Sequence, residues 1–432
     1  MINMRLLIFF VFSFQMHSQI NWINFNTSNS NIPYNKVTSI EFGSSQNSNG
    51  DIFVGTAYGL GILNIDNANF PNNTWVSFSE ETDPNSGLIG NDIINIQKNI
   101  NGDMWICTTN GISILDYNFS IGELTYQNWS YLNTNNSEMP SNMARTILFE
   151  DTGKIWIGTT AGLAIIENNI WDIETFETEG VFSNNIKKII QNPNNEDIYI
   201  GSLNGGFYSW YGDTFNYWNN TNSGLTDNTI NDFVFDSVNN LIITSPSAGL
   251  EVYTEAGNWI LLNSTTNPEL PYFVNSLQNL VIDNDNNLWI STMENGLIRY
   301  KDANWIFYNE ENSGLPDNQI NCLKYDELFN HLWIGTETEG VVMLDLNQES
   351  ININETLEKN DFNPRFRNNS LELNYSGKGA LKIYNISGNL VLEHSITNET
   401  KSVPVNELKA GIYIIEIKTN QKSISEKMLK YF

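Results

Sequence analysis

The sequence predicts an all-β protein: a seven-bladed β-propeller whose last blade is closed by an N-terminal strand, followed by a small C-terminal antiparallel β-sandwich. Three observations carry this prediction. One strand-like motif recurs seven times at intervals of about 45 residues, the period of propeller blades. A Trp-containing strand pattern precedes the first complete copy, and the last copy lacks one. Beyond residue 346 the repeat stops, and strands of a different pattern follow.

The repeated motif corresponds to the second strand of each blade, as in residues 103–112 and 154–163. An alternating run before it predicts the first strand, and a Thr-x-x-Gly turn after it leads into the third. A later run, which carries a Trp in most copies, predicts the fourth. Four strands per repeat without helical periodicity are typical of propellers. The centre of the motif holds, in order, Phe53, Trp105, Trp156, Tyr199, Ile242, Trp289 and Trp333.

The two ends of the repeat region predict how the ring closes. Trp22 lies in a segment, residues 20–26, that matches the fourth-strand pattern, whereas the last copy ends near Leu346 without a fourth strand. A closed ring leaves no long exposed sheet edge. We therefore expect residues 20–26 to form the outer strand of the seventh blade. The copy at 241–250 departs most from the pattern, with Ile242 for Trp and Pro246 in its turn.

The N-terminus predicts export. Arg5 precedes the apolar run 6–14, and Ser18 offers a small residue at the cleavage point, so residues 1–18 have the form of a signal peptide. The run is shorter than the roughly 20 residues that a membrane-spanning helix needs. No other segment is apolar enough to cross a membrane. We expect the mature propeller to occupy residues 19–346.

Composition narrows the choice of partners. The chain has 49 acidic and 21 basic residues, a net charge of −28, which argues against nucleic acid because binding to phosphates depends on Lys and Arg. The charge favours solubility outside the cell and a cationic or neutral ligand. We expect a monomer. Cys107 and Cys322 lie in separate repeats and are expected to be free, buried thiols.

The C-terminal part divides into a linker at 347–364 and a β-domain at 365–432. Alternating runs in the second segment, separated by Gly-containing turns, predict a small antiparallel β-sandwich. The simplest alternative to a dedicated export domain is an accessory sandwich such as a carbohydrate-binding module.

Both parts resemble known families. The repeats in 20–347 resemble the two-component-regulator propeller repeat, which in that family forms sensor regions of membrane-bound kinases; no kinase or membrane-spanning segment follows here. The C-terminal domain resembles the type A sorting domain of type IX secretion substrates. That likeness implies export by the type IX machinery to a Bacteroidetes-like cell surface or the medium. The residues that carry it include Gly388, Gly411, Tyr413, Lys427 and Lys430.

Signatures of catalysis are sparse. The three His residues, His17, His331 and His394, are scattered, and no zinc-type spacing or phosphate-binding Gly-rich loop is present. Residues 283–287 resemble the start of a calcium loop but lack its Gly and distal Glu, so we interpret them as a turn. We expect no cofactor and no metal. Abundant Asp and Glu leave open a secreted carbohydrate-active enzyme with acidic residues in the funnel, since glycosidases use paired carboxylates.

A binding face is the leading hypothesis. The residues between the repeated Thr and Gly differ in every copy, as expected where a fixed framework presents variable loops. The sequence therefore favours a secreted, non-catalytic propeller that binds an extracellular glycan or protein. A structural or adhesive surface protein remains the third possibility. By position alone, the predicted contact residues are Tyr58, Asn110, Asn204, Tyr272, Glu294, Glu337 and Glu339.

Overall fold

The computed structural model contains two compact units, Met1–Glu349 and Ser350–Phe432. Within them the structure describes residues 22–43, 51–64, 74–79, 87–120, 123–175, 183–212, 214–268, 270–348, 365–367, 370–373, 378–385, 390–397, 400–406, 408, 411–418 and 423–430. The predicted signal peptide, most of the predicted linker and Gly388 lie outside these residues.

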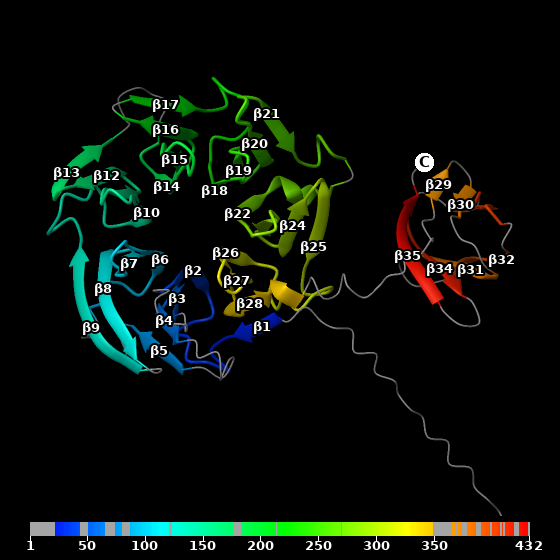
Figure 1. Cartoon of the computed structure of the whole chain (residues 1–432), viewed down its shortest axis with the longest axis horizontal. Coiled ribbons are helices and arrows are strands. Elements are labelled where there is room, and N and C mark those ends of the chain that lie inside the picture. The colour runs from blue at the N-terminus through cyan, green and yellow to red at the C-terminus, as the bar shows by residue number, and fades with distance from the viewer. Residues whose placement is uncertain are drawn as a thin grey trace, which may run out of the picture. The chain divides into compact units, whose positions relative to one another are not determined.

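Seven four-stranded antiparallel sheets form the first unit, and we number them blades 1 to 7 in chain order (Figure 1). The strands of blades 1 to 3 are β2 (Val37–Phe42), β3 (Asp51–Thr56), β4 (Gly59–Asn64), β5 (Thr74–Phe78); β6 (Ile93–Lys98), β7 (Met104–Thr108), β8 (Gly111–Ser120), β9 (Glu123–Leu132); β10 (Ala144–Phe149), β11 (Ile155–Thr159), β12 (Gly162–Glu167), β13 (Ile170–Glu174). Those of blades 4 to 6 are β14 (Ile186–Gln191), β15 (Ile198–Ser202), β16 (Phe207–Tyr211), β17 (Thr214–Trp218); β18 (Asp232–Phe235), β19 (Leu241–Ser245), β20 (Gly249–Tyr253), β21 (Trp259–Leu262); β22 (Leu277–Ile282), β23 (Leu288–Thr292), β24 (Leu297–Lys301), β25 (Asn304–Tyr308).

Blade 7 confirms the predicted closure. It contains β26 (Ile320–Asp326), β27 (His331–Thr336) and β28 (Val341–Asp345), and its outer strand is β1 (Trp22–Phe25) from the start of the chain. Strand β1 runs antiparallel to β28, with Trp22 opposite Leu344 and Phe25 opposite Val341. Figure 1 shows the first strand of every blade on the inside of the ring.

The repeated motif has a physical reason at each position. Its central aromatic residues pack between sheets, Tyr199 half-buried and the others buried, and Trp156, Trp289 and Trp333 are among the largest fully buried side chains. The following Gly lets the next blade approach, since a Cβ on Gly55 would lie 2.5 Å from Ile93 and one on Gly201 2.7 Å from Ile230. The Thr hydroxyl then closes the turn by donating to a backbone oxygen three or four residues on, as in Thr56 to Gly59 (2.8 Å) and Thr336 to Gly340 (2.8 Å).

The second unit is a two-sheet β-structure, as predicted. One sheet has the order β29 (Arg365–Arg367), β30 (Ser370–Glu372), β33 (Ser402–Pro404); the other has the order β32 (Leu390–Ile396), β31 (Gly379–Asn385), β34 (Gly411–Lys418), β35 (Ser423–Lys430). One hydrophobic cluster joins them, with Leu371 and Val403 from the first sheet packed with Leu381 and Ile415 from the second.

Candidate functional site

The turns between second and third strands and the connections between blades meet on one side of the ring. Backbone hydrogen bonds join them: the amide of Gly206 donates to Asn228 (2.7 Å), that of Gly296 to Asn318 (2.9 Å), and that of Gly340 to Asn35 (3.0 Å). We call this side the loop face, defined by those turns (57–58, 109–110, 160–161, 203–205, 246–248, 293–295 and 337–339) and by the inter-blade connections.

The predicted contact residues all lie on the loop face. Six are in the turns, and Tyr272 begins the short 3-10 helix η2 (Tyr272–Asn275) in the connection to blade 6. The side chains of Tyr58 and Tyr272 are 45% and 83% exposed. Of these seven residues, Glu294 and Glu337 line one pocket of the described structure, whereas Tyr58, Asn110, Asn204, Tyr272 and Glu339 are not among its lining residues.

The pocket that Glu294 and Glu337 share lies between blades 6 and 7 and has a volume of about 370 Å³. We call it the mouth pocket. Six of its eight lining residues carry a carboxamide or a carboxylate, and the exposed Met293 adds an apolar edge. The lining residues are Gln278, Asn279, Met293, Glu294, Gln319, Ile320, Asn321 and Glu337.

The Glu337 carboxylate is held in place from two sides. Lys36 Nζ lies 2.9 Å from Oε1, and Asn321 Nδ2 donates to Oε2 at 3.0 Å. Since Lys36 precedes blade 1 and Glu337 belongs to blade 7, the ion pair also crosses the point of ring closure. Tyr34, two residues before Lys36, and Tyr58, in the turn after β3, carry two exposed aromatic rings whose centroids lie 6.1 Å apart.

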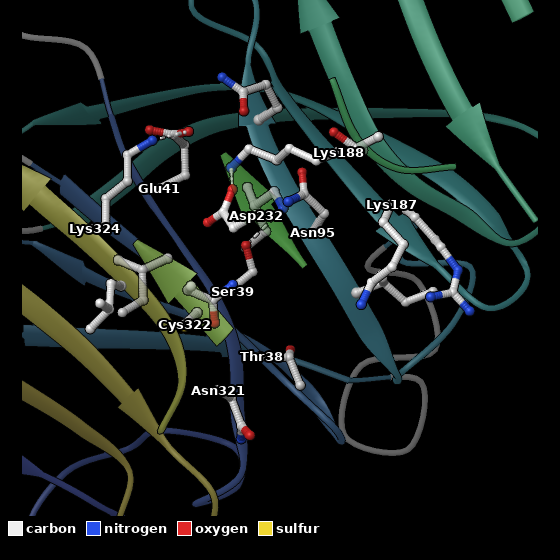
Figure 2. Close-up of a pocket in the computed structure, with 18 of the residues that line it drawn as sticks. Thr38, Ser39, Glu41, Asn95, Lys187, Lys188, Asp232, Asn321, Cys322 and Lys324 are labelled. Atoms are coloured by element: carbon white, nitrogen blue, oxygen red, sulfur yellow. Dashed lines mark hydrogen bonds and ion pairs between the residues drawn. The ribbon is translucent and has the colours of Figure 1, made fainter. Parts of the chain in front are cut away.

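A second cavity, of about 360 Å³, lies in the central channel and is lined by the first strands of all seven blades. It shares Gln278, Asn279 and Asn321 with the mouth pocket. Figure 2 shows the polar side chains that enter it. Lys324 Nζ lies 2.8 Å from Glu41, and Lys188 Nζ lies 2.7 Å from Asp232.

Sequence reasoning expected a funnel at the centre of the ring but did not identify the residues that line it, although the sequence contains a signal for them. In six blades the pairing of first and second strands shifts register near the start of the first strand, which marks a β-bulge. The bulged residue lines the channel, as Thr38, Arg145, Lys187 and Asn321 do. Two consecutive non-alternating residues at the same place in each repeat are the mark of this bulge.

The other sequence candidates have structural partners. Asp283 holds its turn together by accepting hydrogen bonds from the Asp285 and Asn287 amides (2.9 and 2.8 Å) and from Trp289 Nε1 (2.8 Å). His331 opens β27 at the end away from the loop face and lies 3.8 Å from Asp345. Among the described residues no group of acidic, His or Cys side chains is arranged to hold a metal ion.

Both cysteines are free, as expected, but only Cys107 is fully buried. Cys322 is partly exposed on the channel wall, because it follows the bulge of blade 7. Burial raises the pKa of its thiol to about 12, so the thiol is protonated at neutral pH.

The sorting-motif residues of the C-terminal unit occupy its last two strands. Gly411 at the start of β34 pairs with Lys430 at the end of β35, and Tyr413 and Lys427 lie on the same two strands. Residues 363–431 match the family described as the secretion system C-terminal sorting domain. The resemblance inferred for this segment is therefore confirmed.

Solved structures support the propeller. PorZ, an essential bacterial surface component of the type IX secretion system of Porphyromonas gingivalis, is 16% identical, with a TM-score of 0.54 over 94% of this chain and 60% of that chain. The extracellular domains of BT3049 and BT4673, putative two-component and one-component systems of B. thetaiotaomicron, are 19% and 15% identical, with TM-scores of 0.59 and 0.54. They match over 94% and 91% of this chain and 56% and 57% of theirs.

This chain thus spans less than two thirds of each of these three proteins, and the likeness shows the fold. No curated protein matches the sequence. In the part of the chain that the structure describes, no helix is both long and apolar enough to cross a bilayer. The chain is a secreted β-propeller protein that carries a type IX C-terminal sorting domain, destined for the cell surface or the surrounding medium.

Proposed function

We propose that the propeller binds an extracellular ligand on its loop face without transforming it, and that the ligand is a glycan. The mouth pocket supports this proposal most directly. Its carboxylates can accept hydrogen bonds from sugar hydroxyls, and its carboxamides can both accept and donate them. Ligand sites in proteins are typically concave, with a few polar groups that fix orientation.

The exposed tyrosines add a second element to this surface. Tyr34 and Tyr58 are 50% and 45% exposed, and their rings adjoin each other at 6.1 Å. Aromatic rings offer a large, rigid and amphipathic contact surface at low entropic cost, which suits the apolar face of a sugar ring. Lys36, two residues after Tyr34, forms an ion pair with Glu337 of the mouth pocket and so connects the two parts of this surface.

Binding to an array of glycans and polysaccharides by the full chain tests this function. Tyr58→Ala and Glu294→Gln are expected to weaken binding at least tenfold, since the first removes an aromatic ring from the loop face and the second replaces a charged hydrogen-bond acceptor by a neutral amide. Tyr211→Ala is the matched control, because Tyr211 is 69% exposed but ends β16 beside the third-to-fourth strand turn on the opposite side. A chain that binds no glycan, or variants that bind as the wild type does, would refute the proposal.

One observation favours a second function, a carbohydrate-active enzyme. Glu294 and Glu337 face the same pocket, and glycosidases act through two carboxylates. The contacts of Glu337 with Lys36 and Asn321 instead suit a structural role. Reducing ends measured during the binding assay separate the two: release that Glu337→Gln abolishes supports the enzyme, and binding without release supports the proposed function.

A further inference from the structure

The central channel has a charge opposite to that of the whole protein. Six charged residues line it, four basic and two acidic, in a chain whose net charge is −28. The basic residues come from three different blades, so no single sequence run accounts for them. They are Arg145, Lys187, Lys188 and Lys324, and the acidic residues are Glu41 and Asp232.

Both acidic side chains are already engaged. Glu41 pairs with Lys324 at 2.8 Å and accepts the Phe42 amide at 2.8 Å. Asp232 pairs with Lys188 at 2.7 Å and accepts backbone amides from Phe233 (2.9 Å) and Leu280 (3.2 Å). These pairs leave Arg145 and Lys187 without a carboxylate partner among the described residues.

Arg145 and Lys187 occupy the same bulge position on neighbouring blades 3 and 4. Burial lowers the pKa of the Lys187 ammonium, and the nearby Arg145 lowers it further, while Asp232 partly opposes the effect. Lys187 Nζ donates to Asn231 Oδ1 at 2.7 Å, which is a neutral partner. In Figure 2 Lys187 lies apart from the two ion pairs. Two adjacent cations, neither of which has an ion-pair partner among the described residues, favour an anion between them.

Two buried polar atoms in the same channel lack partners. In the described part of the chain, Arg145 Nε has no hydrogen-bond acceptor and Asn95 Oδ1, on the adjacent blade 2, has no donor. Buried polar atoms in native proteins are almost always satisfied, so an unsatisfied donor and acceptor require an explanation. A ligand that brings both an acceptor and a donor satisfies the pair.

We propose that the channel binds a small oxyanion that also carries hydroxyl groups, such as a sugar acid. Arg145 and Lys187 contact the carboxylate, since guanidinium groups bind carboxylates through paired N–H donors. Asn95 Oδ1 accepts a hydrogen bond from a ligand hydroxyl. The cavity, about 360 Å³, falls within the range of small-molecule sites. The proposed contacts of this site, Arg145, Lys187 and Asn95, do not line the mouth pocket, although the two cavities share three other residues, and the proposal does not depend on the glycan surface.

Calorimetric titration of the full chain at low ionic strength tests the proposal, because screening by salt weakens such contacts. The probes are glucuronate, acetate, glucose and sulfate. We expect glucuronate to bind more tightly than acetate and glucose to give no signal. If sulfate also binds, and its binding depends on Arg145 and Lys187, the channel binds oxyanions in general, and the proposed contacts of these two residues with the anion are supported.

The double variant Arg145→Gln, Lys187→Gln is expected to weaken glucuronate binding at least tenfold, and Asn95→Ala to weaken glucuronate but not acetate. Lys301→Gln is the matched control, since it removes one positive charge from the exposed end of β24 outside the channel. Lys187→Gln alone serves if the double variant does not fold. The proposal is overturned if no oxyanion binds, if the cation variants bind as the wild type does, or if glucose or acetate binds as tightly as glucuronate.

The two proposals fail separately. If Tyr58→Ala abolishes glycan binding and still binds glucuronate, the proposal for the channel stands. Conversely, a wild-type chain that binds a glycan array and no oxyanion retains the loop-face function and refutes the channel site.

Discussion

A single buried carboxylate sets a pH dependence of stability. Asp51 is 7% exposed at the start of β3, and its Oδ1 accepts a hydrogen bond from Asn64 Nδ2 at 2.6 Å. Burial raises its pKa from 3.8 to about 6, and the hydrogen bond opposes that rise only in part. One unit of pKa corresponds to about 1.4 kcal/mol, so the charged form of Asp51 destabilises the fold by roughly 3 kcal/mol.

We therefore predict that Asp51→Asn stabilises the propeller at neutral pH. The pKa of Asp51 is higher in the folded than in the unfolded state, so protonation of Asp51 stabilises the fold at low pH. The wild type loses this part of its free energy of unfolding as pH rises from about 4 to about 6 and regains none of it at higher pH. Urea unfolding should show that the variant gains more free energy of unfolding over the wild type at pH 7.5 than at pH 4.5, where only part of the effect is present. An equal difference at both values would contradict the assignment.

Some residues of the candidate site could be predicted from the sequence, and others could not. The positions of Tyr58, Glu294 and Glu337 on the loop face follow from the Thr-x-x-Gly turn, which the repeat makes visible. The channel residues Arg145 and Lys187 were not predicted, because a bulge adds one residue to a strand whose alternation otherwise continues. Which turns line the same pocket depends on the spacing between neighbouring sheets. The alternation of apolar and polar residues along a strand does not encode this spacing.

At the scale of strands and turns, a glycine and a tryptophan act together in three blades. A Cβ on Gly87, Gly224 or Gly314 would lie 2.2–2.6 Å from atoms of Trp129, Trp259 or Trp22 on the outer strand of the blade that the turn enters. This contact explains why Ser-Gly-Leu turns recur with a Trp in the fourth strand. It also explains why Trp22 could be identified from sequence as a missing fourth strand.

Gly314→Ala should therefore weaken the closure of the ring. We expect a loss of about 1–3 kcal/mol, typical of overpacking, because a Cβ on Gly314 would lie 2.6 Å from Trp22, whose ring also packs against Tyr308. Thermal unfolding measures the loss. Adding Trp22→Leu to Gly314→Ala should cost less than the two single changes combined; strict additivity would show that the two residues do not meet. Deletion of residues 19–27 should lower the melting temperature further than either.

For the whole molecule, the sequence identified both units because each has its own repeat or alternation. The short strands of the C-terminal unit share one core drawn from its two sheets. That core contains residues of the second unit alone, and the propeller clusters contain residues of the first alone. Each unit is therefore expected to unfold in its own transition.

This independence makes the export role of the C-terminal unit testable without damage to the propeller. A chain truncated after Asn354 should retain the melting temperature of the propeller, because none of the propeller's hydrophobic clusters loses a member. The same chain should accumulate in the periplasm, since residues 363–431 form the sorting domain. Cell fractionation with an antibody to the propeller measures its location. Fusing residues 350–432 to a periplasmic reporter should carry that reporter outside the cell, whereas normal surface display of the truncated chain would show that export relies on another segment.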